Sequence, residues 1–393
     1  MSMLTRDAKT IIYLGTIHSI TGAFFGAFLV SYMMQIADNQ LLSISIFNIL
    51  KFALIGVGFW ILADFVKRKN KMMVYRGGII LQLFCLLTMA IVQDGIAPYL
   101  AILGAMYGFA MAMRHCPFNV ITAEKINEKI TTRFVGYRTL FGKSASVITP
   151  LLLGLFITIG SYPFMALIMC FVLLFEFYLS YKLTSDTAQK SRFDIKRFLN
   201  GARRSILVRR VLLVDALKGF AGDPLSTALV VYAVYLLHTD FNLGLLMSGL
   251  AIVGILLSYI FGRYAKPQMF PRILLVSNIV MLSFLVLFMG TSGIIMFVIF
   301  RIALWIPANI VGKIREVNLI DASNSACVGH DCKTEFWVFR DAVLNVGRVL
   351  GFGTLLAVGI WGTFDMLKYF IAAMTIIFVI TSTLSIKISR HRK

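Results

Sequence analysis

Six ionisable residues lie inside long apolar stretches of this sequence: His18, Lys51, Lys143, Asp223, Arg301 and Arg348. An ionisable group at the centre of a membrane helix costs about 2.5–3.5 kcal/mol on insertion scales, so such groups usually face a cavity or pair with one another, and they mark function. Four of the six are fixed cations and only one is a carboxylate. This balance predicts contact with an anion, which Arg binds in a bidentate manner and Lys binds as a point charge.

The carboxylate has two open interpretations. Asp223 lies in Gly219-Phe-Ala-Gly-Asp-Pro224, where the proline removes a backbone donor and predicts a kinked helix. Asp223 either carries a proton or forms a static ion pair with Arg301 or Arg348, which would leave only the lysines for an anion. His18 is the other mid-span group that titrates near neutral pH, although a polar histidine without coupling is the simpler interpretation.

The elements that position these residues are membrane helices. Of the 393 residues, 59% are hydrophobic and 14% are charged, and the mean hydropathy is +0.84. Since one span needs about 20 apolar residues, the chain has room for roughly a dozen. We expect an all-α integral membrane protein with twelve transmembrane helices, at residues 10–35, 41–63, 71–92, 96–117, 136–159, 161–182, 211–237, 243–262, 271–290, 292–312, 338–361 and 364–387.

The basic residues predict the orientation of these helices. Of the 38 Lys and Arg residues, 24 lie outside the expected spans, and all of these fall in the two tails and in alternate loops, which are normally cytoplasmic. We therefore expect both termini in the cytoplasm, with the first span retained as a helix. The longest interior connection is a basic linker at 183–210, part of which could lie as an amphipathic helix on anionic lipid or be plainly solvated. It separates two six-helix bundles, at 1–182 and 211–393.

The loop after the second span carries a signature. It reads Gly58-Phe-Trp-Ile-Leu-Ala-Asp-Phe-Val-Lys-Arg-Lys69, and it resembles the loop between the second and third helices of the major facilitator superfamily. Asp64, Arg68 and Lys69 match that signature by position. The departures are Trp60 and Lys67 where glycines belong and Phe65 where a base belongs. The resemblance extends over the chain through its helix number, its division into two sets of six and its long middle loop.

The resemblance implies two bundles that rock about a central cavity. The first, fourth, seventh and tenth helices would line it, and the second, fifth, eighth and eleventh would flank it. All six mid-span ionisable residues fall on these helices, and none falls at that depth on the third, sixth, ninth or twelfth. Asp64, Arg68 and Lys69 would hold one conformation of the transporter, although a simple helix-end ion pair is also open. Residues 142–154 resemble the antiporter motif of the family's exporters, but ordinary helix packing explains them almost as well.

Several other functions are excluded or disfavoured. The basic residues are dispersed among short loops, which argues against nucleic-acid binding. No catalytic triad or phosphate-binding loop appears, so we expect neither an enzyme nor a cofactor. The cluster Cys327-Val-Gly-His330-Asp-Cys332 lacks a standard zinc spacing, and we expect no metal there.

The sequence therefore predicts a secondary transporter that works by alternating access and exports a small organic or amphiphilic, anionic solute in exchange for protons. His18, Lys51, Lys143, Arg301 and Arg348 are the candidate substrate ligands, and Asp223 is the candidate proton carrier. The alternatives are a lipid or lipid-linked headgroup flippase, a multidrug exporter of cations centred on Asp223, and a non-transporting sensor or assembly partner. We expect a monomer in a bacterial plasma membrane, with anionic lipids at its inner face.

Overall fold

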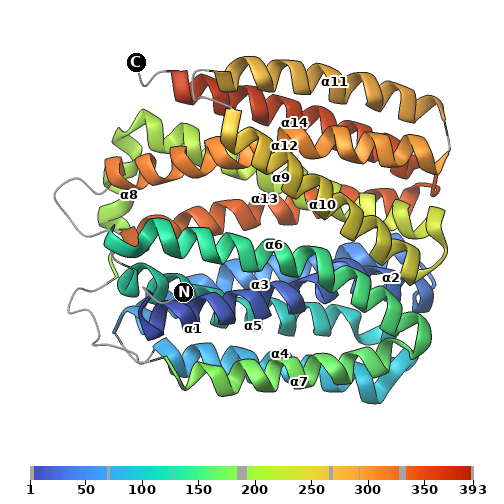
Figure 1. The fold of residues 1–393 in the computed structure, drawn as a ribbon, viewed down its shortest axis with the longest axis horizontal. Coiled ribbons are helices and arrows are strands. Elements are labelled where there is room, and N and C mark those ends of the chain that lie inside the picture. Colours follow the sequence, from blue (N-terminus) through green and yellow to red (C-terminus); the bar gives the residue numbers. More distant parts are fainter. Residues whose placement is uncertain are drawn as a thin grey trace. The chain divides into compact units, whose positions relative to one another are not determined.

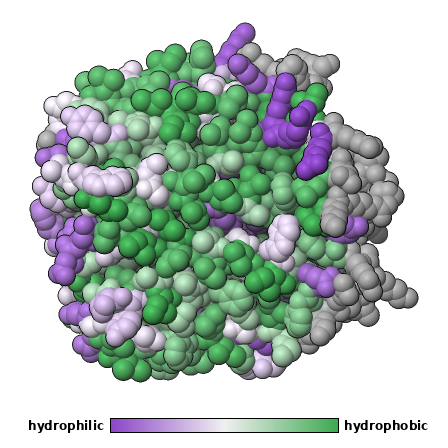
Figure 2. Space-filling view, turned by 180° about the vertical axis from the view of Figure 1, so that it is seen from behind, coloured by the Kyte–Doolittle hydropathy of each residue, from purple (hydrophilic) through white to green (hydrophobic). Residues whose placement is uncertain are grey.

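The computed structural model describes residues 4–68, 71–126, 128–183, 193–264, 269–291, 293–326 and 333–390. Within these ranges every regular element is a helix. Eleven helical stretches are long and apolar enough to cross a membrane. Hydrophobic residues cover most of the molecular face in Figure 2, and many large apolar side chains are exposed, such as Ile91 and Trp361. Soluble proteins rarely expose so large an apolar surface to water, so the chain is a multi-pass membrane protein.

One of the eleven stretches is unusually long. Lys71–Thr122 has 52 residues and begins with α4 (Lys71–Val92). The 3-10 helix η2 (Gln93–Tyr99) follows, and α5 (Leu100–Lys125) comes next. The expected number of twelve spans and the cytoplasmic position of both termini therefore stay predictions.

The chain divides into two compact units. Unit 1 comprises Met1–Phe193 and His238–Ser248, and unit 2 comprises Asp194–Leu237 and Gly249–Lys393. The beginning of α10 (Asp240–Tyr264) thus belongs to unit 1, and the rest of that helix belongs to unit 2. The bundle boundaries expected at 182 and 211 stay a prediction.

Unit 1 is built from helices that run alongside one another (Figure 1). Its first candidate span contains a single π-helical turn between two α-helices. Contacts between α3 and α5 and of α4 with α5 and α7 form much of its interior. The helices of unit 1 besides α4, η2 and α5 are α1 (Arg6–Ala23), η1 (Phe24–Phe28), α2 (Leu29–Ile36), α3 (Gln40–Arg68), α6 (Glu128–Ile159) and α7 (Tyr162–Ser180).

Unit 2 is centred on α9, which packs against α13, α14 and α12. Three glycines bring α9 and α13 into backbone contact. A Cβ atom on Gly347 would lie 2.2 Å from the carbonyl oxygen of Ala216, and Gly219 and Gly351 are equally tight. The helices of unit 2 besides α10 are α8 (Ile195–Arg204), α9 (Ile206–Leu237), α11 (Phe270–Gly290), α12 (Ile294–Ala326), α13 (Lys333–Trp361) and α14 (Met366–Arg390).

Part of the basic linker forms α8. Its apolar residues Phe198 and Ala202 are 1% and 5% exposed and belong to the core of unit 2, where Phe198 packs against Phe336. The Glu335 carboxylate accepts a hydrogen bond from the Asp194 N–H at 3.1 Å, just before the helix begins. The apolar face of α8 is therefore covered by protein. The basic side chain of Arg203, on the same helix, is exposed.

Candidate functional site

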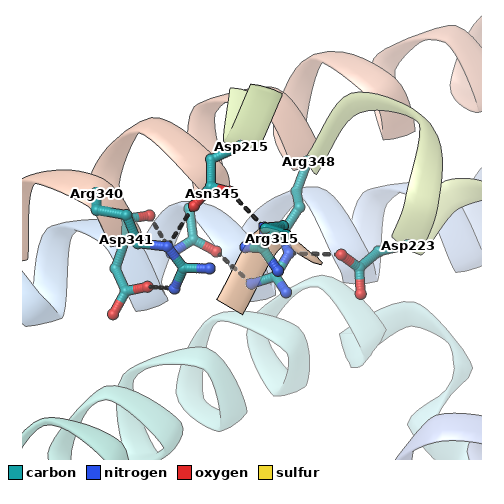
Figure 3. Close-up of polar contacts among 7 residues, drawn as sticks. All are labelled: Asp215, Asp223, Arg315, Arg340, Asp341, Asn345 and Arg348. Carbon is teal, nitrogen blue, oxygen red and sulfur yellow. Dashed lines mark hydrogen bonds and ion pairs between the residues drawn. The ribbon is translucent and has the colours of Figure 1, made fainter. Parts of the chain in front are cut away.

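An ion-pair network joins α9 to its neighbours in unit 2 (Figure 3). The Asp215 carboxylate accepts hydrogen bonds from the guanidinium groups of Arg315 on α12 and Arg340 on α13. Arg340 also pairs with the adjacent Asp341. These groups are largely buried, and the side chain of Asp215 is fully so. Each buried charge is thus compensated by an opposite charge, which membrane burial requires.

The predicted residues Asp223 and Arg348 form the other end of this network. Arg348 Nε donates to Asp223 Oδ2 at 2.7 Å, and Arg348 Nη1 donates to Asn345 Oδ1 at 3.0 Å. The close approach of α9 and α13 at their glycines brings these side chains within reach. Of the two partners that the sequence left open for Asp223, the structure pairs it with Arg348.

The two ends of the network differ in exposure. The side chain of Asp223 is 36% exposed and that of Arg348 is 22% exposed, compared with 0% for Asp215 and 10% for Arg315. A solute can reach the first pair without unfolding the helices, whereas the second is shielded. The Asp223–Arg348 pair is therefore the more accessible end of the network.

Two predicted cations stand outside such pairs. Lys143 on α6 and Arg301 on α12 are partly buried. Within the part of the chain that the structure describes, neither side chain forms an ion pair. A guanidinium or ammonium group at such a position lacks the compensation that the network gives the other cations, so both are candidates for holding an anionic ligand.

The remaining predicted ligands lie in unit 1. The Lys51 ammonium on α3 donates to Asn48 Oδ1 at 2.6 Å and lies 4.4 Å from the centre of the Phe52 ring. The ring of His18 on α1 meets that of His115 on α5 edge to face, with centroids 4.4 Å apart. The sequence analysis did not consider His115, and only the packing of the two helices reveals this pair.

The residues that the sequence predicts to be involved in gating are only partly described. The Asp64 carboxylate accepts a hydrogen bond from the Phe193 N–H at 3.4 Å. Arg68 is the last residue of α3, and Lys69 lies outside the described residues. Cys327, His330 and Cys332 also lie outside them. Elsewhere in the described chain, no group of three or more His, Cys, Asp or Glu side chains could hold a metal ion.

Sequence reasoning missed a buried ion pair in unit 1. Arg114 on α5 donates to both oxygens of Glu176 on α7, at 2.7 Å for Oε2, and the side chains are 1% and 0% exposed. Tyr75 on α4 donates to the same carboxylate at 2.5 Å, and Arg114 also donates to the Gln82 side chain. A glutamate in the run Phe171-Val-Leu-Leu-Phe-Glu-Phe-Tyr-Leu179 was the available signal. The Glu176 carboxylate is thus paired with a buried guanidinium, while Arg114 Nε and Gln82 Nε2 have no hydrogen-bond partner within the described residues.

The comparison with known families decides the identity of the fold. The family model of the Major Facilitator Superfamily matches residues 8–312. The chain belongs to the Major Facilitator Superfamily. The resemblance seen in the loop after the second span is therefore confirmed. Its membership of this family and its candidate membrane helices make the chain a membrane transporter.

Relatives and solved structures agree with this assignment. The uncharacterized protein YqgE of Bacillus subtilis (strain 168) is 20% identical over 351 residues, which cover 86% of this chain and 80% of YqgE. A POT family transporter in complex with a thioalcohol-conjugated peptide has a TM-score of 0.68 at 13% identity, with 98% of this chain and 96% of that chain covered. A bacterial homologue of the iron transporter ferroportin in the inward-facing state has a TM-score of 0.64 at 14% identity, with 98% of both chains covered. At these identities the two structures share the fold with this chain.

Proposed function

We propose that this protein is a secondary active transporter of small organic anions, that it works by alternating access, and that transport is coupled to protons. The observation that carries the proposal is the surplus of positive charge inside its candidate spans. Lys143 and Arg301 form no ion pair within the described residues, and the Asp223–Arg348 pair is partly exposed. An organic anion would supply the missing counter-charge.

Two observations bear on the direction of coupling. The likeness of residues 142–154 to the exporters' antiporter motif favours export in exchange for protons. The Asp223–Arg348 pair favours movement of anion and proton together, because an anion that takes Arg348 removes one counter-charge of the Asp223 carboxylate and so favours its protonation. We give the pair the greater weight, since packing of Gly154 against the backbone of Asp240 already explains that small residue.

Among the alternatives, a multidrug exporter of cations centred on Asp223 receives less support. The Arg348 guanidinium already occupies that carboxylate. A cation would have to displace the Arg348 guanidinium from this carboxylate. We further propose that the chain works in a bacterial plasma membrane without enzymatic activity, as its likeness to a Bacillus subtilis protein suggests.

The test is transport by purified protein in liposomes. Uptake of labelled mono- and dicarboxylates, neutral solutes and organic cations is compared while the external pH is varied at constant internal pH. We expect anion uptake that speeds up on external acidification, and its loss in Arg301→Ala and Lys143→Ala. Arg209→Ala, which removes an exposed cation of the same type near the start of α9, is the control and should transport normally.

Other outcomes have definite meanings. Anion uptake that slows on external acidification would establish exchange with protons in place of co-transport. Cation uptake that survives Arg301→Ala and fails in Asp223→Asn would overturn the anion proposal. If no solute moves and lipid scrambling is seen in the same liposomes, the flippase alternative replaces it.

A further inference from the structure

Unit 2 contains an apolar cavity between α10, α11 and α12. Its volume is about 250 Å³, and its walls include Leu257, Ile273, Trp305, Ile306 and Ile310. Among the described residues, no charged side chain lines it. A second hollow of about 390 Å³ shares Ile273 and Ile306 with it. Both hollows have mainly apolar walls, although Arg272 also lines the second, and such walls suit a flexible hydrocarbon chain.

One polar side chain at this cavity is held by its own helix. The Asn309 side-chain amide donates to the carbonyl oxygen of Trp305 at 2.9 Å, which fixes it against its own helix. The Trp305 indole is held by α10, since a Cβ atom on Gly254 would lie 2.2 Å from its ring. The cavity therefore has an aromatic wall that α10 holds in place, and its polar lining residues are Ser258, Tyr264 and Asn309.

The unpaired Arg301 is one helical turn from this wall. Residues 301, 305 and 309 follow one another at intervals of four along α12, and such residues lie on the same face of a helix. Arg301 precedes Trp305 by about 6 Å of helix axis. One end of the apolar cavity thus lies close to a cation that forms no ion pair within the described residues. A ligand that fits both parts has an anionic head and an apolar tail.

We propose that the substrate of this transporter is an amphiphilic organic anion, whose head is bound by Arg301 and whose hydrocarbon tail occupies the cavity between α10, α11 and α12. This inference rests on the proposed function and narrows its substrate class. Lys143 and Arg348 have no part in binding the tail, so tail length and head charge are recognised by separate groups of side chains.

The experiment measures binding of straight-chain alkanoates, from acetate to octanoate, to the purified protein in lipid nanodiscs. Affinity is expressed against the free aqueous concentration. Burial of one methylene group contributes about 0.8 kcal/mol, so we expect affinity to rise about fourfold for each carbon added until the cavity is full. Ser258→Phe places a ring in the cavity and should abolish this dependence while acetate binding is kept.

Ser283→Phe is the matched control, because Ser283 is an exposed residue of α11 that lines neither hollow. It should keep the full dependence on chain length. Arg301→Gln should lose binding of every alkanoate. If the wild-type protein binds acetate and octanoate equally well, or if Ser258→Phe leaves the dependence unchanged, the tail site is wrong although anion transport can still hold. If no alkanoate or other organic anion binds, the proposed function itself fails.

Discussion

The ion pair between Asp223 and Arg348 allows a direct test of how charge and binding are linked. In the wild-type protein an anion competes with the Asp223 carboxylate for Arg348. Protonation of Asp223 removes the competitor, so anion affinity should rise as the pH falls. Asp223→Asn lacks the competing charge at every pH, and we expect roughly tenfold tighter anion binding at neutral pH, within the usual range of coupling between two sites.

The same variant should bind anions with little dependence on pH, as measured by ligand-induced thermal stabilisation between pH 5 and 8. Asp365→Asn is the control, because Asp365 is an exposed carboxylate outside the network. It should keep the wild-type pH profile. An Asp223→Asn protein that binds no anion would show that the carboxylate itself is needed at the site.

At these positions, the sequence identified the residues better than it identified their partners. Asp223 and Arg348 interrupt apolar stretches, so their cost in a membrane was visible from hydropathy alone. Asp215 and Arg114 lie close to the ends of their expected spans and Arg315 lies just beyond its span, where charges are ordinary. Their burial depends on how helices pack. The partner of a charge is a matter of helix contact, which spacing within one helix does not specify.

Contact between α9 and α13 depends on their glycines. A Cβ atom on Gly347 would lie 2.2 Å from a backbone oxygen of α9, whereas one on Gly353, on the same helix, would meet no atom within 4 Å. Gly347→Ala must therefore push the helices apart, at a cost of about 1–3 kcal/mol typical of overpacking. We expect a lower melting temperature and tighter anion binding, because the separation moves the competing Asp223 carboxylate away from Arg348.

Gly353→Ala should keep the stability and binding of the wild-type protein, or gain slightly in stability from the higher helix propensity of alanine. Both variants are compared by melting of the detergent-solubilised protein and by alkanoate binding. Equal melting temperatures for the two would mean that α9 and α13 do not approach one another at Gly347 as closely as described.

Helix positions were the most predictable feature of the molecule. Long apolar runs determine them. The helices α11 and α14 begin and end within three residues of the predicted spans, and α9 ends as predicted but starts five residues earlier. The pattern did not reveal the π-helical turn of η1 or the packing of α8 onto the core of unit 2. Both depend on contacts with other helices, and the basic residues of α8 fit a solvated linker equally well.

The number of spans governs the orientation of the whole chain. As a continuous α-helix, the 52 residues of Lys71–Thr122 would extend about 78 Å, more than twice the thickness of the hydrocarbon layer. The break at η2 contains Asp94 and Pro98, which suit a loop at the membrane surface. We therefore expect α4 and α5 to cross separately and all candidate helices together to make twelve spans.

Labelling of single cysteines in a cysteine-free background tests this arrangement in intact cells. Thr5→Cys and Arg203→Cys should react with an impermeant maleimide only after the membrane is opened, whereas Asn39→Cys and Thr291→Cys should react from outside. All four positions are exposed. If Lys71–Thr122 crossed only once, every later loop would change sides: Arg203→Cys would then react in intact cells and Thr291→Cys would not. The charge asymmetry opposes that result, because the basic linker would lie outside.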